Sequence, residues 1–307
     1  MENTETYMRR CFELASQGKG AVAPNPLVGC VIVKDGKIMA EGYHHGIGQN
    51  HAEVDAIEKV GDPELLKGAT LYVNLEPCVH HGKTPPCCDR IIECGIKKVV
   101  ISGLDPNEMV HGRGLEKLQS AGIEVKKEVL LSDEMNLNRR FRTYHEKKRP
   151  YVILKWAQSA DHFMDAERTA GEKGSVVISS EESRKLVHLW RSQEAAIMVG
   201  TNTVLNDNPK LTTRLVKGKN PLRIALDRDM KIPADSKILS DGNPTLIYTS
   251  RESGKKGAAE FQKIDFAGDV FTDVLNDLYD REIQSVLVEG GHVLLESILS
   301  SGLWDEA

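Results

Sequence analysis

Three side chains in the N-terminal half of the sequence have the types and spacing of a metal-binding group. They are His51, Cys78 and Cys87, and each cysteine follows a proline. A neutral imidazole and two thiolates form a three-ligand shell for zinc, which leaves the fourth tetrahedral position for water. Glu53 lies two positions after His51, where its carboxylate can face that water without competing for the metal. The group therefore predicts a nucleophile at neutral pH and a carboxylate that moves its proton.

Two other interpretations of these residues are open. A closed structural zinc site would need a fourth ligand, and Cys88, His80 and His81 are available nearby in the sequence. A tRNA-editing deaminase uses the same kind of zinc centre, but with two residues between its cysteines. Here the spacing is much longer, and residues 1–150 carry as many basic as acidic side chains, which does not indicate a nucleic-acid surface. Because a structural zinc site has no use for Glu53, we favour the catalytic interpretation.

The composition limits the class of protein. The chain has 307 residues and a formal net charge of −5, with 40 basic and 45 acidic side chains. No apolar run approaches the roughly 18 residues of a membrane span, and the first residues do not resemble a secretory signal. We therefore expect a cytoplasmic protein with a small-molecule substrate and with no nucleic-acid or membrane partner. Six cysteines are too few for a disulfide scaffold, and ordinary buried thiols are predicted for Cys11, Cys30, Cys88 and Cys94.

The length predicts two domains, and the hydrophobic pattern makes both of them α/β. In the first half, the pattern predicts a β-hairpin over 28–43, helices over 52–60 and 86–95, and a buried strand over 69–75. A hairpin followed by alternating helices and strands is typical of a three-layer α/β sandwich. The metal-binding residues then lie at the ends of successive elements.

The second half contains short apolar runs that are typical of buried parallel strands. A helix over 180–193 is predicted to begin with a capping box, in which a serine N-cap is followed three residues later by Glu. The domain boundary is placed at 147–150, where a basic stretch ends at Pro150. We expect this stretch to be a solvated helix end and linker, with a phosphate-binding patch as the less favoured alternative. The predicted strands are 195–200, 222–227, 244–249 and 285–291.

Two segments around the metal-binding residues resemble a known enzyme family. Residues 29–53 (GCVIVKDGKIMAEGYHHGIGQNHAE) and 76–87 (EPCVHHGKTPPC) are similar to the deaminase domain of the bifunctional riboflavin-biosynthesis deaminase/reductases, which has a cytidine-deaminase-like fold. The resemblance implies that residues 1–147 form a zinc-dependent deaminase domain. This domain would remove the 2-amino group of 2,5-diamino-6-(5-phosphoribosylamino)pyrimidin-4(3H)-one by hydrolysis. The roles it implies are zinc ligation by His51, Cys78 and Cys87, proton transfer by Glu53, and substrate binding by Asn25, His44, His80 and Lys83.

Three later segments resemble the reductase half of the same family. They are residues 154–161 (LKWAQSAD), 199–214 (VGTNTVLNDNPKLTTR) and 288–291 (VEGG). The resemblance implies that residues 150–307 form a dihydrofolate-reductase-like α/β domain, which uses NADPH to reduce the ribosyl group to ribityl. The residues it implies are Ser175, Arg191, Leu211, Arg214 and Glu289 for the substrate, with the arginines as phosphate clamps, and Ala157, Thr203, Asp207, Gly291, His292, Val293 and Leu294 for the cofactor.

The second half departs from the family pattern near the expected cofactor. His162 stands where the family usually has Gly, and Val177 stands where it often has Trp. Residues 303–307 are expected to begin a strand that the family pattern continues, so we expect the reductase domain to be incomplete at its C-terminus. The alternative to a bifunctional enzyme is therefore a deaminase with an impaired or scaffold-like second domain. Members of the family are often oligomeric, which implies that the chain can form a homo-oligomer.

Overall fold

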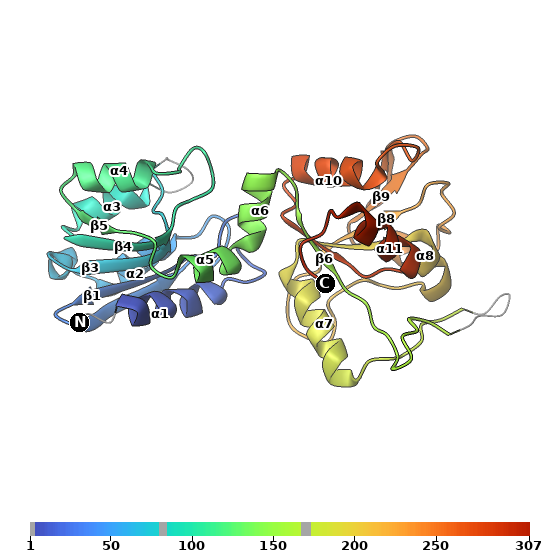
Figure 1. The fold of residues 1–307 in the computed structure, drawn as a ribbon, viewed down its shortest axis with the longest axis horizontal. Helices are drawn as coiled ribbons and strands as arrows, with labels where there is room; N and C mark the ends of the chain where they lie inside the picture. The colour runs from blue at the N-terminus through green and yellow to red at the C-terminus, as the bar shows by residue number, and fades with distance from the viewer. Residues whose placement is uncertain (1–3, 80–84, 167–172) are drawn as a thin grey trace. The chain divides into compact units, whose positions relative to one another are not determined.

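The computed structural model describes residues 4–79, 85–166 and 173–307. By its internal contacts the chain divides into two compact units, Met1–Lys147 and Lys148–Ala307 (Figure 1). Among the described residues, no helix has the length and apolarity needed to cross a lipid bilayer.

The N-terminal unit begins with a helix and a β-hairpin, after which helices and strands alternate. In chain order its elements are α1 (Thr4–Ser16), β1 (Gly29–Lys34), β2 (Lys37–Tyr43), α2 (Ala52–Val60), the 3-10 helix η1 (Pro63–Leu66), β3 (Thr70–Leu75), α3 (Cys87–Glu93), β4 (Lys98–Gly103), α4 (Arg113–Ser120), β5 (Glu124–Lys126), α5 (Leu131–Leu137) and α6 (Arg139–Lys147).

These strands form one five-stranded sheet with the order β2-β1-β3-β4-β5. β1 is antiparallel to β2 and β3, whereas β3, β4 and β5 are parallel. One apolar cluster packs α1 against the sheet, and another packs α2, α3 and α4 against its other face (Figure 1). The predicted hairpin and three-layer sandwich are confirmed.

A glycine lets α2 approach the sheet closely. A Cβ atom at Gly42 in β2 would lie 2.4 Å from the carbonyl oxygen of Ala52 and 2.5 Å from the backbone nitrogen of Ala56, both in α2. A side chain there would push α2 outward. Because His51 directly precedes α2, this contact helps to fix where His51 stands relative to the ends of β1 and β3.

The C-terminal unit is a second α/β unit with a larger sheet. Its elements are β6 (Tyr151–Leu154), α7 (Glu181–Gln193), β7 (Ala196–Gly200), α8 (Thr201–Asp207), β8 (Leu222–Leu226), α9 (Lys237–Ser240), β9 (Thr245–Thr249), β10 (Gly254–Lys256), β11 (Ala259–Lys263), α10 (Val270–Asp280), β12 (Ser285–Val288) and α11 (His292–Ser301).

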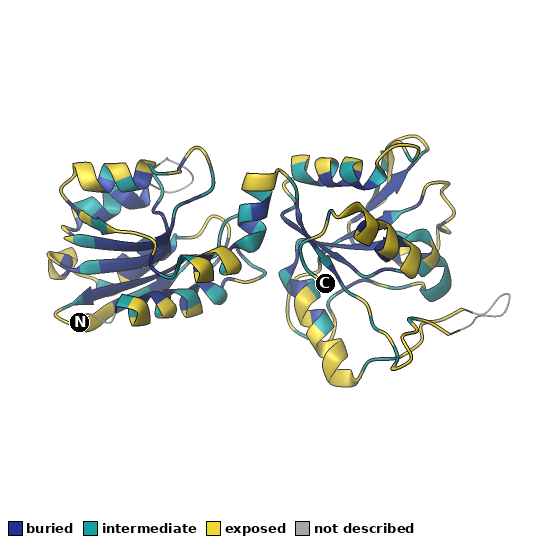
Figure 2. Ribbon diagram, in the orientation of Figure 1, coloured by how far each residue is buried: buried dark blue, intermediate teal, exposed yellow. Residues whose placement is uncertain are grey.

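The sheet of this unit has the order β10-β11-β9-β8-β7-β12-β6. Every neighbouring pair is parallel except β10 with β11, which confirms the prediction of buried parallel strands. α10 and α11 pack in the apolar cluster on one face, and α8 and α9 in the cluster on the other. Figure 2 shows the strands of both units as largely buried and the outer helix faces as exposed. The carboxyl ends of β6, β12, β7 and β8 lie at one edge of the sheet, where Glu289, Gly291 and the start of α8 follow.

One local prediction is wrong, and another is only partly correct. The N-cap of α7 is Ser180, which accepts a hydrogen bond from the backbone of Ser183, so the residue at the third helical position is Ser and no capping box forms. The basic stretch near the boundary is only partly solvated, because two of its arginines pair with acidic residues inside their own units. Arg142 contacts the fully buried Glu134 at 2.5 Å, and Arg149 contacts Asp305 at 2.6 Å.

The last residues of the chain lie along β6. Glu306 pairs with Ile153 in a single parallel bridge, and its carbonyl oxygen accepts a hydrogen bond from Leu154 at 2.8 Å. The expected beginning of a strand in 303–307 is thus present as one bridge.

Candidate functional site

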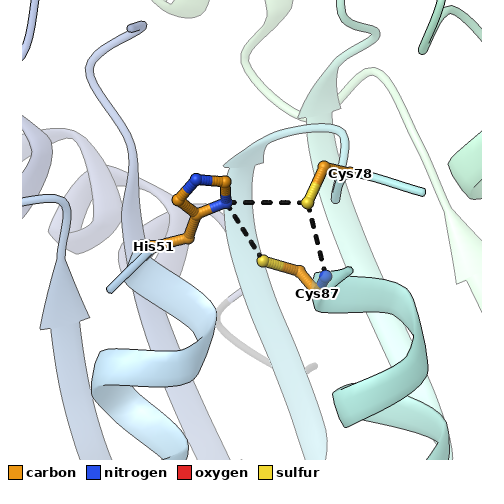
Figure 3. Close-up of side chains that lie close together, drawn as sticks. All are labelled: His51, Cys78 and Cys87. Carbon is orange, nitrogen blue, oxygen red and sulfur yellow. Dashed lines mark hydrogen bonds between the residues drawn. The ribbon is translucent and has the colours of Figure 1, made fainter. Parts of the chain in front are cut away.

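The three predicted metal ligands converge in the N-terminal unit. His51 is the N-cap of α2, Cys78 follows β3, and Cys87 opens α3. The Nδ1 atom of His51 lies 3.6 Å from the sulfur of Cys78 and 3.3 Å from the sulfur of Cys87 (Figure 3). A tetrahedral zinc ion, with Zn–N of about 2.1 Å and Zn–S of about 2.3 Å, separates nitrogen from sulfur by about 3.6 Å. The ligand atoms of the three residues all lie within 4.8 Å of one another. The arrangement therefore fits zinc.

The electrostatics of the three ligands favour a thiolate at Cys78. A hydrogen bond from the Cys87 thiol, together with His51, lowers the pKa of Cys78 to about 4. The backbone N–H of Cys87 also donates to the Cys78 sulfur at 3.3 Å. The hydrogen bond with Cys78 raises the pKa of His51. A negative charge on this group is therefore already stabilised by the protein, as a cation site requires.

Glu53 has the environment expected of a proton carrier. It lies in the first turn of α2 and is only 3% exposed. Burial raises the pKa of its carboxyl group, so that the group holds a proton more readily than an exposed glutamate does. A carboxyl group in this condition, two residues from a ligand, can take up a proton and return it.

Cys88 is not the fourth ligand of a closed site. Its thiol donates to the carbonyl oxygen of Pro77 at 3.3 Å, away from the three ligand atoms. The other two candidates, His80 and His81, lie outside the described residues. Cys11, Cys30, Cys88 and Cys94 are all at most 2% exposed, which confirms the prediction of buried thiols.

The loop around Asn25 reaches the metal-binding group through His44. The ring of His44 packs edge-on against that of His51, with centroids 5.4 Å apart. Its Nδ1 lies 3.0 Å from the carbonyl oxygen of Asn50, and because a carbonyl can only accept, Nδ1 carries the proton. Its Nε2 then accepts from the amide nitrogen of Asn25 at 2.9 Å. Both nitrogens of His44 are thus used by the protein, whereas the Asn25 side-chain oxygen faces no partner among the described residues.

Two buried amides that the sequence did not indicate hold this loop. Asn138 accepts a hydrogen bond from the backbone N–H of Leu27 at 2.8 Å and donates to the Leu27 carbonyl at 3.1 Å. Asn74 donates to the same carbonyl at 2.9 Å and accepts from Gly29 at 2.7 Å. They fix the chain two residues after Asn25. A buried asparagine carries no spacing signal, so only the folded structure reveals this role.

Glu76 is a second residue that sequence reasoning missed, although it stands two positions before Cys78. It is 4% exposed, and its carboxylate anchors the chain just before the ligand. The carboxylate of Glu76 accepts hydrogen bonds from four backbone N–H groups, in one loop and at the beginning of α4. The donors are Asp105 at 3.3 Å, Gly112 at 3.0 Å, Gly114 at 2.8 Å and Leu115 at 3.2 Å.

In the C-terminal unit, the predicted substrate residues Arg191, Arg214 and Glu289 gather around Thr212. Arg191 in α7 forms a two-bonded ion pair with Glu289 after β12, with distances of 2.7 and 2.6 Å. Nη1 atoms of Arg191 and Arg214 both donate to the carbonyl oxygen of Thr212 at 3.3 Å. Burial and the charge of Arg191 lower the pKa of Arg214. Among these residues only Arg191 is paired with a carboxylate, whereas Arg214 bonds to uncharged oxygens of Thr212, and the net positive charge favours an anionic ligand.

The other two predicted substrate residues lie differently. Leu211 is 2% exposed and its side chain belongs to an apolar cluster, so it can offer only its backbone to a ligand. Ser175 is exposed and follows Gly174, whose N–H donates to Asn206 in α8 at 2.8 Å. Within the described part of the chain, no hydrogen bond joins Ser175 to either arginine.

The predicted cofactor residues are brought together only in part. A Cβ atom at Gly291 would lie 3.2 Å from the Thr203 hydroxyl, and one at Gly200 would lie 3.7 Å from Leu294. The N–H of Gly200 donates to the Gly290 carbonyl at 2.9 Å, which fixes the turn after β12 beside α8. Of the remaining predicted residues, Ala157 follows β6 at the same sheet edge, Asp207 ends α8, and His292 and Val293 begin α11 with exposed side chains.

His162, the departure from the family pattern, has a backbone conformation that suits glycine. Its φ angle is +70°. It lies in a tight turn in which Ser159 accepts from His162 and donates to Phe163. The chain thus retains the left-handed position although the residue has a Cβ atom.

Two family models match the chain. The cytidine and deoxycytidylate deaminase zinc-binding region matches residues 1–103, and the RibD C-terminal domain matches residues 150–307.

Similar proteins cover both halves at once. The chain is 44% identical over 309 residues to riboflavin biosynthesis protein RibD of Aquifex aeolicus, covering 99% of this chain and 85% of that protein. It is 39% identical over 320 residues to the RibD of Escherichia coli, covering 98% and 85%. Among solved structures, it is similar to a diaminohydroxyphosphoribosylaminopyrimidine deaminase/5-amino-6-(5-phosphoribosylamino)uracil reductase of Thermotoga maritima, with a TM-score of 0.88, 43% identity and coverage of 97% and 84%. It is also similar to Acinetobacter baumannii RibD, with a TM-score of 0.88, 34% identity and coverage of 98% and 84%.

Proposed function

The chain belongs to the family of bifunctional RibD deaminase/reductases of riboflavin biosynthesis, and on that premise we propose its substrate and the task of each unit. The substrate is 2,5-diamino-6-(5-phosphoribosylamino)pyrimidin-4(3H)-one. Residues 1–147 deaminate it, and residues 150–307 reduce the ribosyl group of the product to ribityl. The observation that carries the proposal is the convergence of the zinc-binding residues His51, Cys78 and Cys87 beside the buried carboxyl of Glu53.

In the deaminase unit, His51, Cys78 and Cys87 would hold zinc, which would activate a water molecule for attack. Glu53 takes one proton of this water and gives it to the pyrimidine ring nitrogen, and it then moves the proton of the newly formed C–OH group to the departing amino group. A C–O bond forms at the amino-bearing carbon, its C–N bond breaks, and ammonia leaves. The raised pKa of Glu53 supports this role, because the carboxyl must hold the proton between the two transfers.

Asn25 and His44 act on the substrate as a pair. His44 holds the Asn25 amide through Nε2, so that the side-chain oxygen of Asn25 is left to accept from the pyrimidine edge. His44 was expected to contact the substrate itself, and we now propose that it works through Asn25. His80 and Lys83, which lie outside the described residues, are proposed as substrate contacts on the resemblance alone, with Lys83 near the phosphate.

In the reductase unit, we place the substrate phosphate at Arg191 and Arg214 and the cofactor at the turn where Gly291 faces Thr203. Membership of the family implies NAD(P)H as cofactor, and we propose NADPH. When bound, the cofactor would supply a hydride to the anomeric carbon of the ribosyl group, whose bond to the ring oxygen breaks as that oxygen takes up a proton. Glu289 keeps the Arg191 guanidinium in one orientation. Ser175 and the Leu211 backbone are proposed to line the substrate, and Ala157, Asp207, His292, Val293 and Leu294 are proposed to line the cofactor.

The proposal is tested with the purified chain and the diaminopyrimidine substrate, with and without NADPH. We expect ammonia release in both samples and NADPH oxidation only after deamination. Ammonia release without NADPH oxidation would support the alternative of a deaminase with a scaffold-like second unit. No ammonia release from a zinc-loaded preparation would overturn the proposed substrate.

A further inference from the structure

Arg191, Arg214 and Glu289 together are called the arginine site here. One histidine in the C-terminal unit contacts this site, although the sequence did not indicate a role for it. His188 lies in α7, one turn before Arg191, and is 5% exposed. Its Nδ1 accepts a hydrogen bond from the backbone N–H of Arg214 at 2.9 Å. His188 and Arg191 lie on the same face of α7. This one helix therefore positions both arginines, because it contains Arg191 and because His188 binds the main chain of Arg214.

The bond fixes the chemical form of His188. A backbone N–H can only donate, so Nδ1 must carry a lone pair and a neutral ring must carry its proton on Nε2. The neutral form is also the favoured one, because burial and the charges of Arg191 and Arg214 lower the pKa of His188 to about 4. A neutral acceptor holds Arg214 in place without adding a third positive charge or neutralising the two that are present.

The segment that carries Arg214 is attached at separate points. Leu211 is anchored in an apolar cluster with a φ angle of +54°, and the carbonyl oxygen of Thr212 accepts from both arginines. The N–H of Thr213 donates to Asn220 at 2.9 Å. Among the described residues, the main-chain N–H of Arg214 donates to His188. The exposed guanidinium of Arg214 therefore extends from a backbone whose direction His188 sets.

We propose that His188 is a positioning residue of the reductase site, which holds Arg214 so that its guanidinium and that of Arg191 bind one phosphate group together. This inference rests on the proposed reductase function. A bidentate or shared anion contact needs both guanidinium groups in defined places, so a shift of the Arg214 main chain weakens phosphate binding without touching the hydride transfer.

The test compares His188→Leu, which removes the acceptor, with His188→Asn, whose side-chain oxygen can stand near the position of Nδ1. We expect His188→Leu to raise KM for the phosphorylated reductase substrate roughly tenfold, the effect of about 1.4 kcal/mol. Its kcat and its KM for NADPH should change less than about twofold, and His188→Asn should restore most of the lost affinity. Competitive inhibition by inorganic phosphate should weaken in parallel with the change in KM.

Controls separate this role from a general loosening of the unit. Thr213→Val removes the hydroxyl bond from Thr213 to the Lys219 carbonyl in the same segment but leaves the Arg214 N–H bonded, and should leave KM unchanged. NADPH binding reports whether the C-terminal unit of each variant is folded, and ammonia release reports on the other unit. If His188→Leu disrupts folding, the decision falls to His188→Asn and to His188→Gln, whose longer side chain carries its amide to the position of Nε2.

The results distinguish the inference from the proposed function. If the unmodified chain fails to oxidise NADPH with the deaminated substrate, the reductase function is overturned. If the unmodified chain is active and folded His188→Leu has the same KM, the positioning role is overturned. It is also overturned if His188→Gln retains the affinity and His188→Asn loses it, because the Nε2 side of the ring would then matter.

Discussion

The metal-binding group and the arginine site differ in how their residues are distributed along the chain. His51, Cys78 and Cys87 lie within 37 consecutive positions, at the ends of helices and a strand that follow one another in one unit. Arg191 and Glu289 are 98 positions apart and meet because β12 lies beside β7 in the sheet. A site whose residues come from neighbouring elements can be recognised from their spacing in the sequence. A site whose residues are brought together by the order of the strands can be recognised only once the fold is known. The two sites also lie in separate units, so each can be changed while the other serves as the control.

The largest expected effect is that of Glu53→Gln. The substitution keeps the size of the side chain but removes the group that takes the proton, so ammonia release should fall by roughly 10² to 10⁴-fold. Zinc content should be unchanged, because Glu53 is not a ligand. NADPH oxidation with the already deaminated substrate should also be unchanged, and steady-state assays of both reactions check these expectations. Retention of ammonia release would contradict the assignment of Glu53, and loss of both activities would contradict the independence of the two sites.

Replacing the exposed arginine should have the next largest effect. Arg214→Met keeps most of the aliphatic stem but removes the charge, and a hydrogen bond to a charged group contributes about 1.5–3 kcal/mol. KM for the phosphorylated reductase substrate should therefore rise roughly 10- to 100-fold. Arg228→Met, at another exposed arginine of the unit, is the matched control. A similar rise in KM for NADPH would place Arg214 at the cofactor and not at the substrate.

The same contrast explains what could be predicted from the sequence. The metal ligands, the hairpin and the parallel strands follow from local spacing and apolar runs, and the structure confirms them. The roles of His188, Asn74 and Asn138 depend on backbone groups of segments that are distant in the sequence, and such partners leave no pattern in side-chain types. The prediction of a solvated basic stretch fails at Arg142 for a related reason, since the acid with which Arg142 pairs lies in α5, an element that the pattern did not reveal.

A moderate effect is expected from pH on the stability of the C-terminal unit. The pKa of His188 is about 4 in the folded chain and about 6.5 in an unfolded one. Above pH 6.5 the ring is neutral in both states and contributes nothing. As the pH falls from 6.5 towards 4, the unfolded chain binds a proton that the folded chain does not, so the folded state loses stability. At pH 5.5 the loss should be about 1.4 kcal/mol.

Denaturant unfolding of the unmodified chain and of His188→Asn, at pH 7.5 and 5.5, measures this effect. The free energy of unfolding of the variant should decrease less between the two pH values, because it lacks the titrating ring. Arg191, Arg214 and Glu289 surround the ring and are present in both proteins, so their contributions cancel in the difference. An equal decrease in the two proteins would show that His188 does not titrate in this range.

The smallest expected effect concerns His162, in the tight turn with Ser159 that follows β6. With φ at +70°, a residue that has a Cβ atom loses about 1 kcal/mol relative to a relaxed conformation, and glycine avoids this cost. His162→Gly should therefore stabilise the C-terminal unit by up to about 1 kcal/mol. His162→Ala is the matched control, because it also removes the contact with Gln158 at 3.1 Å but keeps the Cβ atom. Denaturant unfolding should show a gain for His162→Gly alone. An equal gain in both variants would mean that the His162 side chain, and not its backbone conformation, is what destabilises this turn.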